Sequence, residues 1–125
     1  MKGFSLLELL VVVAIIGIIS AVGITSYNGY ISSVKTKQAQ TGLQSIYLEQ
    51  EEYKSINKQY YRPSGGCGDQ TNTINNGLFS GQITLDNSNF RFCISGNATS
   101  YTATAYDINN SRTTHWIRNT NQKSW

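Results

Sequence analysis

A single carboxylate, Glu8, lies within an otherwise apolar stretch near the start of the chain. From Phe4 to Ile24 every residue except Ser5, Glu8 and Ser20 is apolar or glycine. A charged side chain inside such a stretch is costly in a membrane, so it is a candidate functional group that requires a cationic partner. The chemistry that Glu8 offers is therefore the formation of an ion pair.

Two cysteines, Cys67 and Cys93, form a second candidate site. In an exported protein an even number of cysteines indicates one disulfide. Two free thiols or half of a metal site are the alternatives, and without a neighbouring histidine we expect no metal. A disulfide would stabilise the fold by about 3 to 4 kcal/mol in the chain-entropy model.

Cations and aromatic rings are mixed near the C-terminal end. Arg112, Trp116, Arg118 and Lys123 lie there, with Trp125 as the final residue. Such a mixture occurs in grooves that bind nucleic acid. The alternative, which the sequence favours, is that Trp116 packs on a sheet while the charges are solvated.

No pattern in the sequence indicates catalysis. There is no nucleophile motif, phosphate-binding loop or pair of acids, and the only histidine, His115, has no cysteine or carboxylate beside it. We therefore expect a protein without enzymatic activity or a cofactor, with His115 on the surface of a strand. The net charge of +3 is too small to indicate a partner.

The apolar stretch must position Glu8. Its 21 residues would rise about 31 Å as an α-helix, against a hydrocarbon core of about 30 Å. A secretory signal peptide would have a small-residue cleavage site after this stretch, but here an amphipathic pattern follows directly. An ordinary signal-anchor helix, with Glu8 reaching the membrane interface, is an alternative.

The amphipathic half of the helix, from Ser26 onward, has two apolar stripes at helical spacing. The first contains Tyr27, Ile31 and Val34, and the second contains Ala39, Leu43, Ile46 and Tyr53. They are offset by about 120°, so we expect the first to face other helices and the second to face the sheet of this chain. One broad core face is the alternative. Pro63 predicts that the helix ends by Arg62.

The remainder of the chain predicts a small antiparallel sheet. After a long loop at residues 63–81, strand patterns occur at 82–85, 90–95 and 101–106, with a weaker one at 115–118. In the second strand Phe90, Phe92 and Ile94 should face the helix, while Cys93 points toward the loop. The predicted fold is α+β, with a long N-terminal helix packed on three to four antiparallel strands.

The N-terminal residues resemble the class III signal of type IV pilins and pseudopilins. The resemblance rests on Lys2-Gly3, the following Phe4-Ser5-Leu6-Leu7-Glu8-Leu9 and the apolar run at residues 11–18, and it is strong over about the first thirty residues. It implies a ladle-shaped fold with three parts. Residues 1–3 would be a leader, residues 4–25 a helix that first spans the membrane and then enters a filament core, and residues 26–125 the second half of the helix with a globular head.

In this family a membrane-embedded prepilin peptidase cuts after the glycine and methylates the new amino terminus. The resemblance thus implies cleavage between Gly3 and Phe4, with N-methyl-Phe4 at the start of the mature chain. Glu8 of an incoming subunit would then neutralise the amine of Phe4 in a neighbour. Since an unpaired carboxylate costs several kcal/mol in a low dielectric, the subunit would leave the bilayer only where a partner amine is available.

The chain departs from the family pattern in two ways. Pilins usually have a proline at the position of Thr25, so Gly17 and Gly23 are the remaining candidate weak points of the helix. Many major pilins also enclose a carboxy-terminal loop with a disulfide, whereas here a long segment follows Cys93. The usual disulfide-bounded receptor region is therefore not carried over.

The expected function is that of a structural subunit, major or minor, of a type IV pilus that serves adhesion, twitching motility or DNA uptake. The protein would reside in the bacterial inner membrane as a precursor and later in an extracellular filament. Its partners would be other copies of itself, prepilin peptidase and the pilus assembly machinery, with nucleic acid as a weaker candidate. A pseudopilin of a type II secretion system and a DNA-binding minor pilin are the alternatives.

Overall fold

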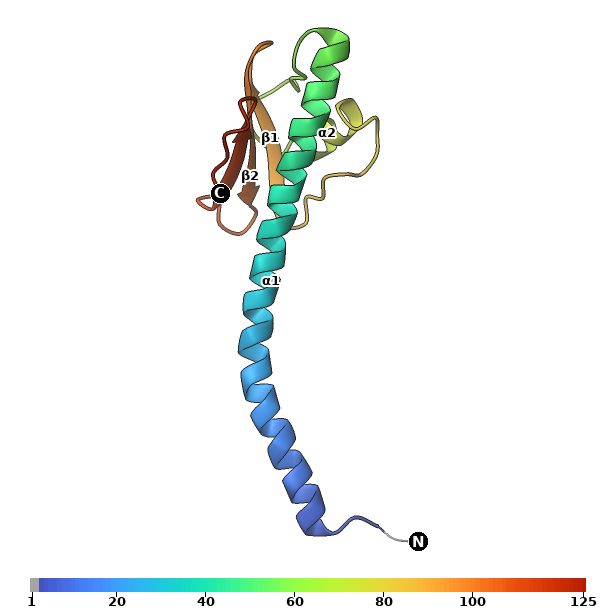
Figure 1. Cartoon of the computed structure of the whole chain (residues 1–125), viewed down its shortest axis with the longest axis vertical. Helices are drawn as coiled ribbons and strands as arrows, with labels where there is room; N and C mark the ends of the chain where they lie inside the picture. Colours follow the sequence, from blue (N-terminus) through green and yellow to red (C-terminus); the bar gives the residue numbers. More distant parts are fainter. Residues whose placement is uncertain (1–2) are drawn as a thin grey trace. The chain divides into compact units, whose positions relative to one another are not determined.

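A computed structural model describes residues 3–125, so the predicted leader residues 1 and 2 lie outside the described residues (Figure 1). The elements are α1 (Leu6–Asn57), α2 (Thr71–Gly77), β1 (Phe90–Gly96), β2 (Tyr101–Asp107) and β3 (Thr114–Arg118). The chain divides into two compact units, one reaching to Lys35 and one formed by Thr36–Trp125. Each unit is described by itself.

The first unit is the apolar part of α1. The helix runs through Gly17 and Gly23 without a break, and its large apolar side chains are exposed, by fractions from 46% at Val11 to 87% at Leu6. Exposure on this scale marks a surface that another apolar phase or protein covers. By length and composition this helix is able to cross a membrane.

In the second unit α1 packs on the sheet through the second predicted stripe. Ala39, Leu43 and Ile46 are buried, and Tyr53 is packed against the same core. Phe92 approaches the helix at Gly42, where an added Cβ would lie 2.8 Å from the ring. A larger residue at this position would therefore require the Phe92 ring to shift, and the prediction that the second stripe faces the sheet is confirmed.

The helix ends at Asn57, before Arg62 as predicted, and the chain then folds back along it. Buried Gln50 holds the returning segment. Its Nε2 donates to the carbonyl of Tyr61 at 2.9 Å, and its Oε1 accepts from the backbone N–H of Tyr61 at 2.7 Å. A polar side chain on the buried face of α1 is thus fully paired, as burial requires.

The sheet is a three-stranded antiparallel meander in the order β1-β2-β3, which confirms the predicted fold class. The prediction of a strand at residues 82–85 was wrong. The side chain of Asn75 pairs this segment instead, because its Oδ1 accepts from the N–H of Leu85 and its Nδ2 donates to the carbonyl of Leu85, both at 2.9 Å. An amide side chain thus takes the place of a neighbouring strand.

The loop predicted at residues 63–81 contains a helix, α2, which the polar sequence did not indicate. Asn and Thr disfavour helix interiors because their side chains compete for backbone hydrogen bonds. The short helix is held by burial of Ile74 and by Asp69, whose carboxylate accepts from the N–H and hydroxyl of Thr71. Partial burial opposes ionisation of Asp69, but these hydrogen bonds and one from Asn87 lower its pKa below the usual value.

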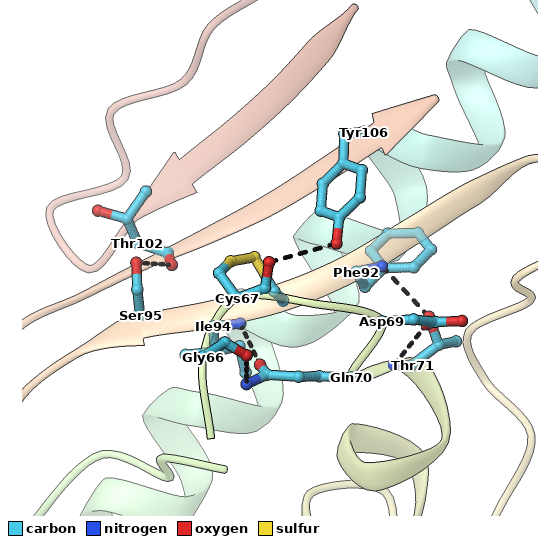
Figure 2. The surroundings of a disulfide bond; sticks show 11 residues. Gly66, Cys67, Asp69, Gln70, Thr71, Phe92, Ile94, Ser95, Thr102 and Tyr106 are labelled. Carbon is cyan, nitrogen blue, oxygen red and sulfur yellow. Dashed lines mark hydrogen bonds between the residues drawn. A yellow bond between two sulfur atoms is a disulfide. The ribbon is translucent and has the colours of Figure 1, made fainter. Parts of the chain in front are cut away.

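The predicted disulfide between Cys67 and Cys93 is present, with a Cα–Cα distance of 5.3 Å (Figure 2). Beside it, two residues complete the free edge of β1. The N–H of Gln70 donates to the carbonyl of Phe92 at 3.0 Å, and the Oε1 of Gln70 accepts from the N–H of Ile94 at 2.9 Å. The hydroxyl of Thr71 accepts from the N–H of Phe92 at 3.2 Å. The disulfide therefore pins a segment that acts as a substitute strand.

Replacing both cysteines with serine is expected to destabilise the head. The bridge closes a separation of 26 residues, for which the entropic contribution is about 3 to 4 kcal/mol. In a head of this size such a loss lowers the melting temperature by more than about 10 °C. Differential scanning calorimetry of a truncated protein that begins at Ser26 measures this change in melting temperature. An unchanged melting temperature, or free thiols in the native protein by mass spectrometry, would show that the bridge does not support the head.

Candidate functional site

The N-terminal candidate site begins with a capping box. The carboxylate Oε2 of Glu8 accepts from the backbone N–H of Ser5 at 2.9 Å, and the hydroxyl of Ser5 accepts from the N–H of Glu8 at 3.2 Å. This reciprocal pair satisfies two donors at the start of α1. Sequence reasoning noted Glu8 but missed the role of Ser5, although the spacing Ser-x-x-Glu is the known signature of this cap.

The capping box gives Glu8 a partner within its own chain. The predicted ion pair with Phe4 of another subunit requires a second chain, and it stays a prediction. Gly3 and Phe4 precede α1 in non-helical backbone, with Phe4 85% exposed. A Cβ added at Gly3 would meet no atom within 4 Å. Among residues 3–125, no atom therefore crowds Gly3, and the Phe4 side chain is open to solvent.

The C-terminal candidate site lies on β3 and the tail that follows it. The Arg118 guanidinium lies over the ring of Trp116, 4.7 Å from its centroid, and the Lys123 ammonium lies 5.7 Å from the centroid of the Trp125 ring. Cations held against aromatic faces in this way are stabilised by the ring quadrupole. Residues 108–125 contain no acidic side chain, so this part of the head is basic.

The tail reaches this position by pairing with the outer edge of β3. Lys123 forms a bridge with Ile117. The N–H of Ser124 donates to the carbonyl of Trp116 at 3.1 Å, and the N–H of Trp116 donates to the hydroxyl of Ser124 at 3.0 Å. Asn121 turns the chain with a φ of 63°, a left-handed conformation that asparagine tolerates well.

The structure brings two of the four predicted residues together, because Trp116 and Arg118 lie on one face of β3. Lys123 pairs with Ile117 on the tail, so strand alternation places its side chain on the opposite face, beside Trp125. Arg112 does not join them, because it lies in the exposed turn that precedes β3, whereas Arg118 ends the strand. The favoured expectation that Trp116 packs on the sheet is correct only in part, since its side chain is half-buried and carries Arg118.

His115 is not the surface residue that the sequence predicted. It is half-buried and lies between two rings, 5.9 Å from the centroid of Phe90 and 6.4 Å from that of Trp125. Strand alternation places it on the same face as buried Ile117. Its Nε2 is buried and has no hydrogen-bond partner among the described residues. Within residues 3–125 no three His, Cys, Asp or Glu side chains are grouped to hold a metal ion.

Comparison with known proteins defines the class of this molecule. Residues 25–115 match the family model described as type IV minor pilin ComP, DNA uptake sequence receptor. Residues 1–24 match the prokaryotic N-terminal methylation motif. With the long apolar helix and the three-stranded antiparallel sheet, these matches show that the chain belongs to the type IV pilin family.

Curated relatives match less than half of the chain. The type IV major pilin protein PilA of Myxococcus xanthus is 37% identical over 47% of this chain and 27% of its own length. The type IV major fimbrial protein FimA of Dichelobacter nodosus is 46% identical over 38% of this chain and 32% of its own length. The chain thus spans about a third or less of the length of these relatives. No solved structure matches it.

Proposed function

We propose that this pilin is a filament subunit that binds DNA through the basic end of its head. The observation that carries the proposal is the match of residues 25–115 to a family described as a DNA uptake sequence receptor. The site that supports it is the basic edge formed by β3 and its tail, where Arg118 lies over the Trp116 ring on one face and Lys123 lies beside the Trp125 ring on the other. Phosphate contacts from cations give affinity, and exposed rings stack on bases.

Assembly into the filament follows from the N-terminal segment. Residues 1–3 are removed by a prepilin peptidase, Phe4 becomes the methylated first residue, and residues 4–25 cross the inner membrane before they enter the filament core. Glu8 exchanges its hydrogen bond with Ser5 for an ion pair with the amine of Phe4 in a neighbouring subunit. The match of residues 1–24 to the methylation motif supports this route, as does the exposure of the apolar side chains.

A pseudopilin role remains the alternative within the family. Pseudopilins often have an acidic calcium-binding loop near the carboxyl end, and in the C-terminal part of this chain only Asp107 is acidic. The family match to a DNA receptor and the basic β3 edge both favour the pilus.

Replacing Arg118 and Lys123 with alanine together is expected to weaken DNA binding by at least about tenfold at physiological salt. Removing two phosphate contacts should also reduce the slope of log affinity against log salt by about 1.4 to 1.8, since each contact contributes about 0.7 on single strands and about 0.9 on duplexes. Fluorescence anisotropy with labelled DNA at several salt concentrations measures both quantities.

The matched control removes two cations from α1. Lys35 and Lys37 are both exposed and lie outside β3 and its tail. Alanine at these two positions changes the net charge by the same amount, so we expect little effect on affinity or slope. Equal losses in the two double variants would mean that net charge alone governs binding, and the assignment to β3 and its tail would be wrong.

A further inference from the structure

The face of the sheet turned away from α1 carries polar and aromatic side chains. Strand alternation places the buried residues Phe92, Ala103 and Ile117 on the helix side. The opposite side presents Arg91, Thr102, Thr104, Tyr106, Trp116 and Arg118, which we call the open face. All six of these side chains are half-buried or exposed. Between Arg91 and the end of β1 this side also carries buried Cys93, whose disulfide holds the Cys67 segment against it.

The register of the strands arranges the open face in rows. Arg91 lies opposite Tyr106, Thr104 lies opposite Trp116, and Thr102 lies opposite Arg118. Tyr106 and Trp116 are therefore diagonal neighbours on adjacent strands. The arginines lie at opposite ends of the same face, with the two rings between them.

The rings are held in place by their surroundings. The hydroxyl of Tyr106 donates to the carbonyl of Cys67 at 3.4 Å, beside the disulfide (Figure 2). The backbone of Trp116 is fixed on one side by β2 and on the other by Ser124. Rings that are already ordered lose little conformational freedom when a ligand stacks on them.

The charge of the open face suits a polyanion. Its six side chains include two arginines and no acid, with threonine hydroxyls between them. The carboxylate of Asp69 interacts electrostatically with Arg91, so the charge available to a ligand lies mainly at Arg118. At the end of the face where Arg118 lies, an open groove of about 360 Å³ is lined by residues that include Ser95, Thr102, Arg118 and Asn119. A phosphate group in this groove would lie beside the guanidinium and within reach of the hydroxyls.

Because bases in a duplex are stacked on one another, a ring on a protein surface can stack only on unpaired bases or on the end of a duplex. We propose that the open face is a stacking surface for unpaired bases, so that the preferred ligand of this pilin is single-stranded DNA. The inference rests on the proposed function, since it specifies which form of DNA the head binds. Trp116 and the guanidinium above it provide one stacking plane, and Tyr106 provides a second.

The chain has two tryptophans, which allows a direct spectroscopic test. In a full-length Trp125→Phe protein kept in detergent micelles, all tryptophan emission comes from Trp116. This protein is titrated with a single strand of about 16 nucleotides and with the duplex of the same sequence at the same salt. We expect the single strand to bind at least about fivefold tighter, which corresponds to the lower bound for one stacked base, and to quench the emission of Trp116.

Two variants in the same background identify the ring as the cause. Trp116→Ala should lose at least about fivefold in affinity for the single strand, while Trp116→Phe, which keeps an aromatic ring, should retain most of it. Affinity for the duplex, measured by anisotropy, should be nearly the same in both variants. Equal duplex binding also shows that the head of the alanine variant is folded.

Each outcome gives a clear answer. If the duplex binds as tightly as the single strand and leaves the emission of Trp116 unchanged, the stacking inference is wrong while DNA binding stands. If the alanine and phenylalanine variants lose single-strand affinity equally, stacking by the ring is also excluded. If neither form of DNA binds, both the inference and the proposed function are overturned.

Discussion

A Gly3→Val protein is expected to accumulate in the membrane as an uncleaved precursor and to contribute no subunits to filaments. A peptidase that cuts between Gly3 and Phe4 must bring the backbone of this junction against its own catalytic groups, and a branched side chain would obstruct that approach. A Cβ at Gly3 would meet no atom of this chain within 4 Å. The substitution therefore leaves the fold of the subunit unchanged, and the defect reports on processing.

Mass spectrometry of the membrane fraction measures this result, because the uncleaved protein retains residues 1–3. Gly17→Ala is the matched control, since a Cβ at Gly17 also meets no atom within 4 Å and lies inside the helix. It should be cut normally. If the Gly3→Val protein were cleaved and produced in normal amounts, the cleavage site would lie elsewhere in the chain.

A Glu8→Ala protein is expected to be inserted and cleaved normally and yet to yield almost no filaments. Removing the carboxylate makes residence in the membrane easier, because a buried unpaired charge is costly. The same change removes the partner for the amine of Phe4 in a neighbouring subunit. The loss of the capping box with Ser5 costs only about 1 kcal/mol, which a helix of 52 residues tolerates.

Counting filaments by electron microscopy and measuring the processed fraction by mass spectrometry separate these two effects. Ser20→Ala is a suitable control, because the hydroxyl of Ser20 only donates to the carbonyl of Ile16 within the same helix, at 2.7 Å. This variant should assemble as the unsubstituted protein does. Normal filament numbers for Glu8→Ala would contradict the ion-pair mechanism.

The helix and the strands were predictable because their patterns are local. The two stripes of α1 follow from spacing alone, and Leu43 lies in the core as its stripe required. Alternation in β1 correctly placed Phe92 toward the helix and Cys93 toward the disulfide. These features depend on the spacing of apolar residues along the chain and on the number of cysteines, and both can be read directly from the sequence.

Features that depend on single side chains reaching distant backbone were not predictable. Asn75 pairs with Leu85 across ten positions, and Gln70 pairs with β1 across 24 positions. Nothing in the spacing of these residues marks them, because a polar side chain on a short helix is usually solvated. The strand wrongly predicted at residues 82–85 results from the Asn75 contact, and the missed helix α2 depends in the same way on side chains, through burial of Ile74 and the hydrogen bonds of Asp69.

The C-terminal candidate site was predicted from its mixture of cations and aromatic rings, but the strand pairing decides where each of these residues lies. Trp116 and Arg118 are two positions apart on a strand, so their shared face follows from alternation. Lys123 reaches the same strand edge, on the other face, only because the chain turns at Asn121 and pairs with β3. Tyr106 and Arg91 were not singled out at all, since their place on the same face depends on the register of three strands.

The central claim is that this chain is a processed subunit of a type IV pilus. Mass spectrometry of filaments sheared from the cell surface tests it most directly. The account predicts a peptide that begins at Phe4, carries one methyl group on its amine and is recovered in the filament fraction, together with an intact disulfide between Cys67 and Cys93. Filaments that lack the chain, with the cellular protein still beginning at residue 1 or 2, would contradict it.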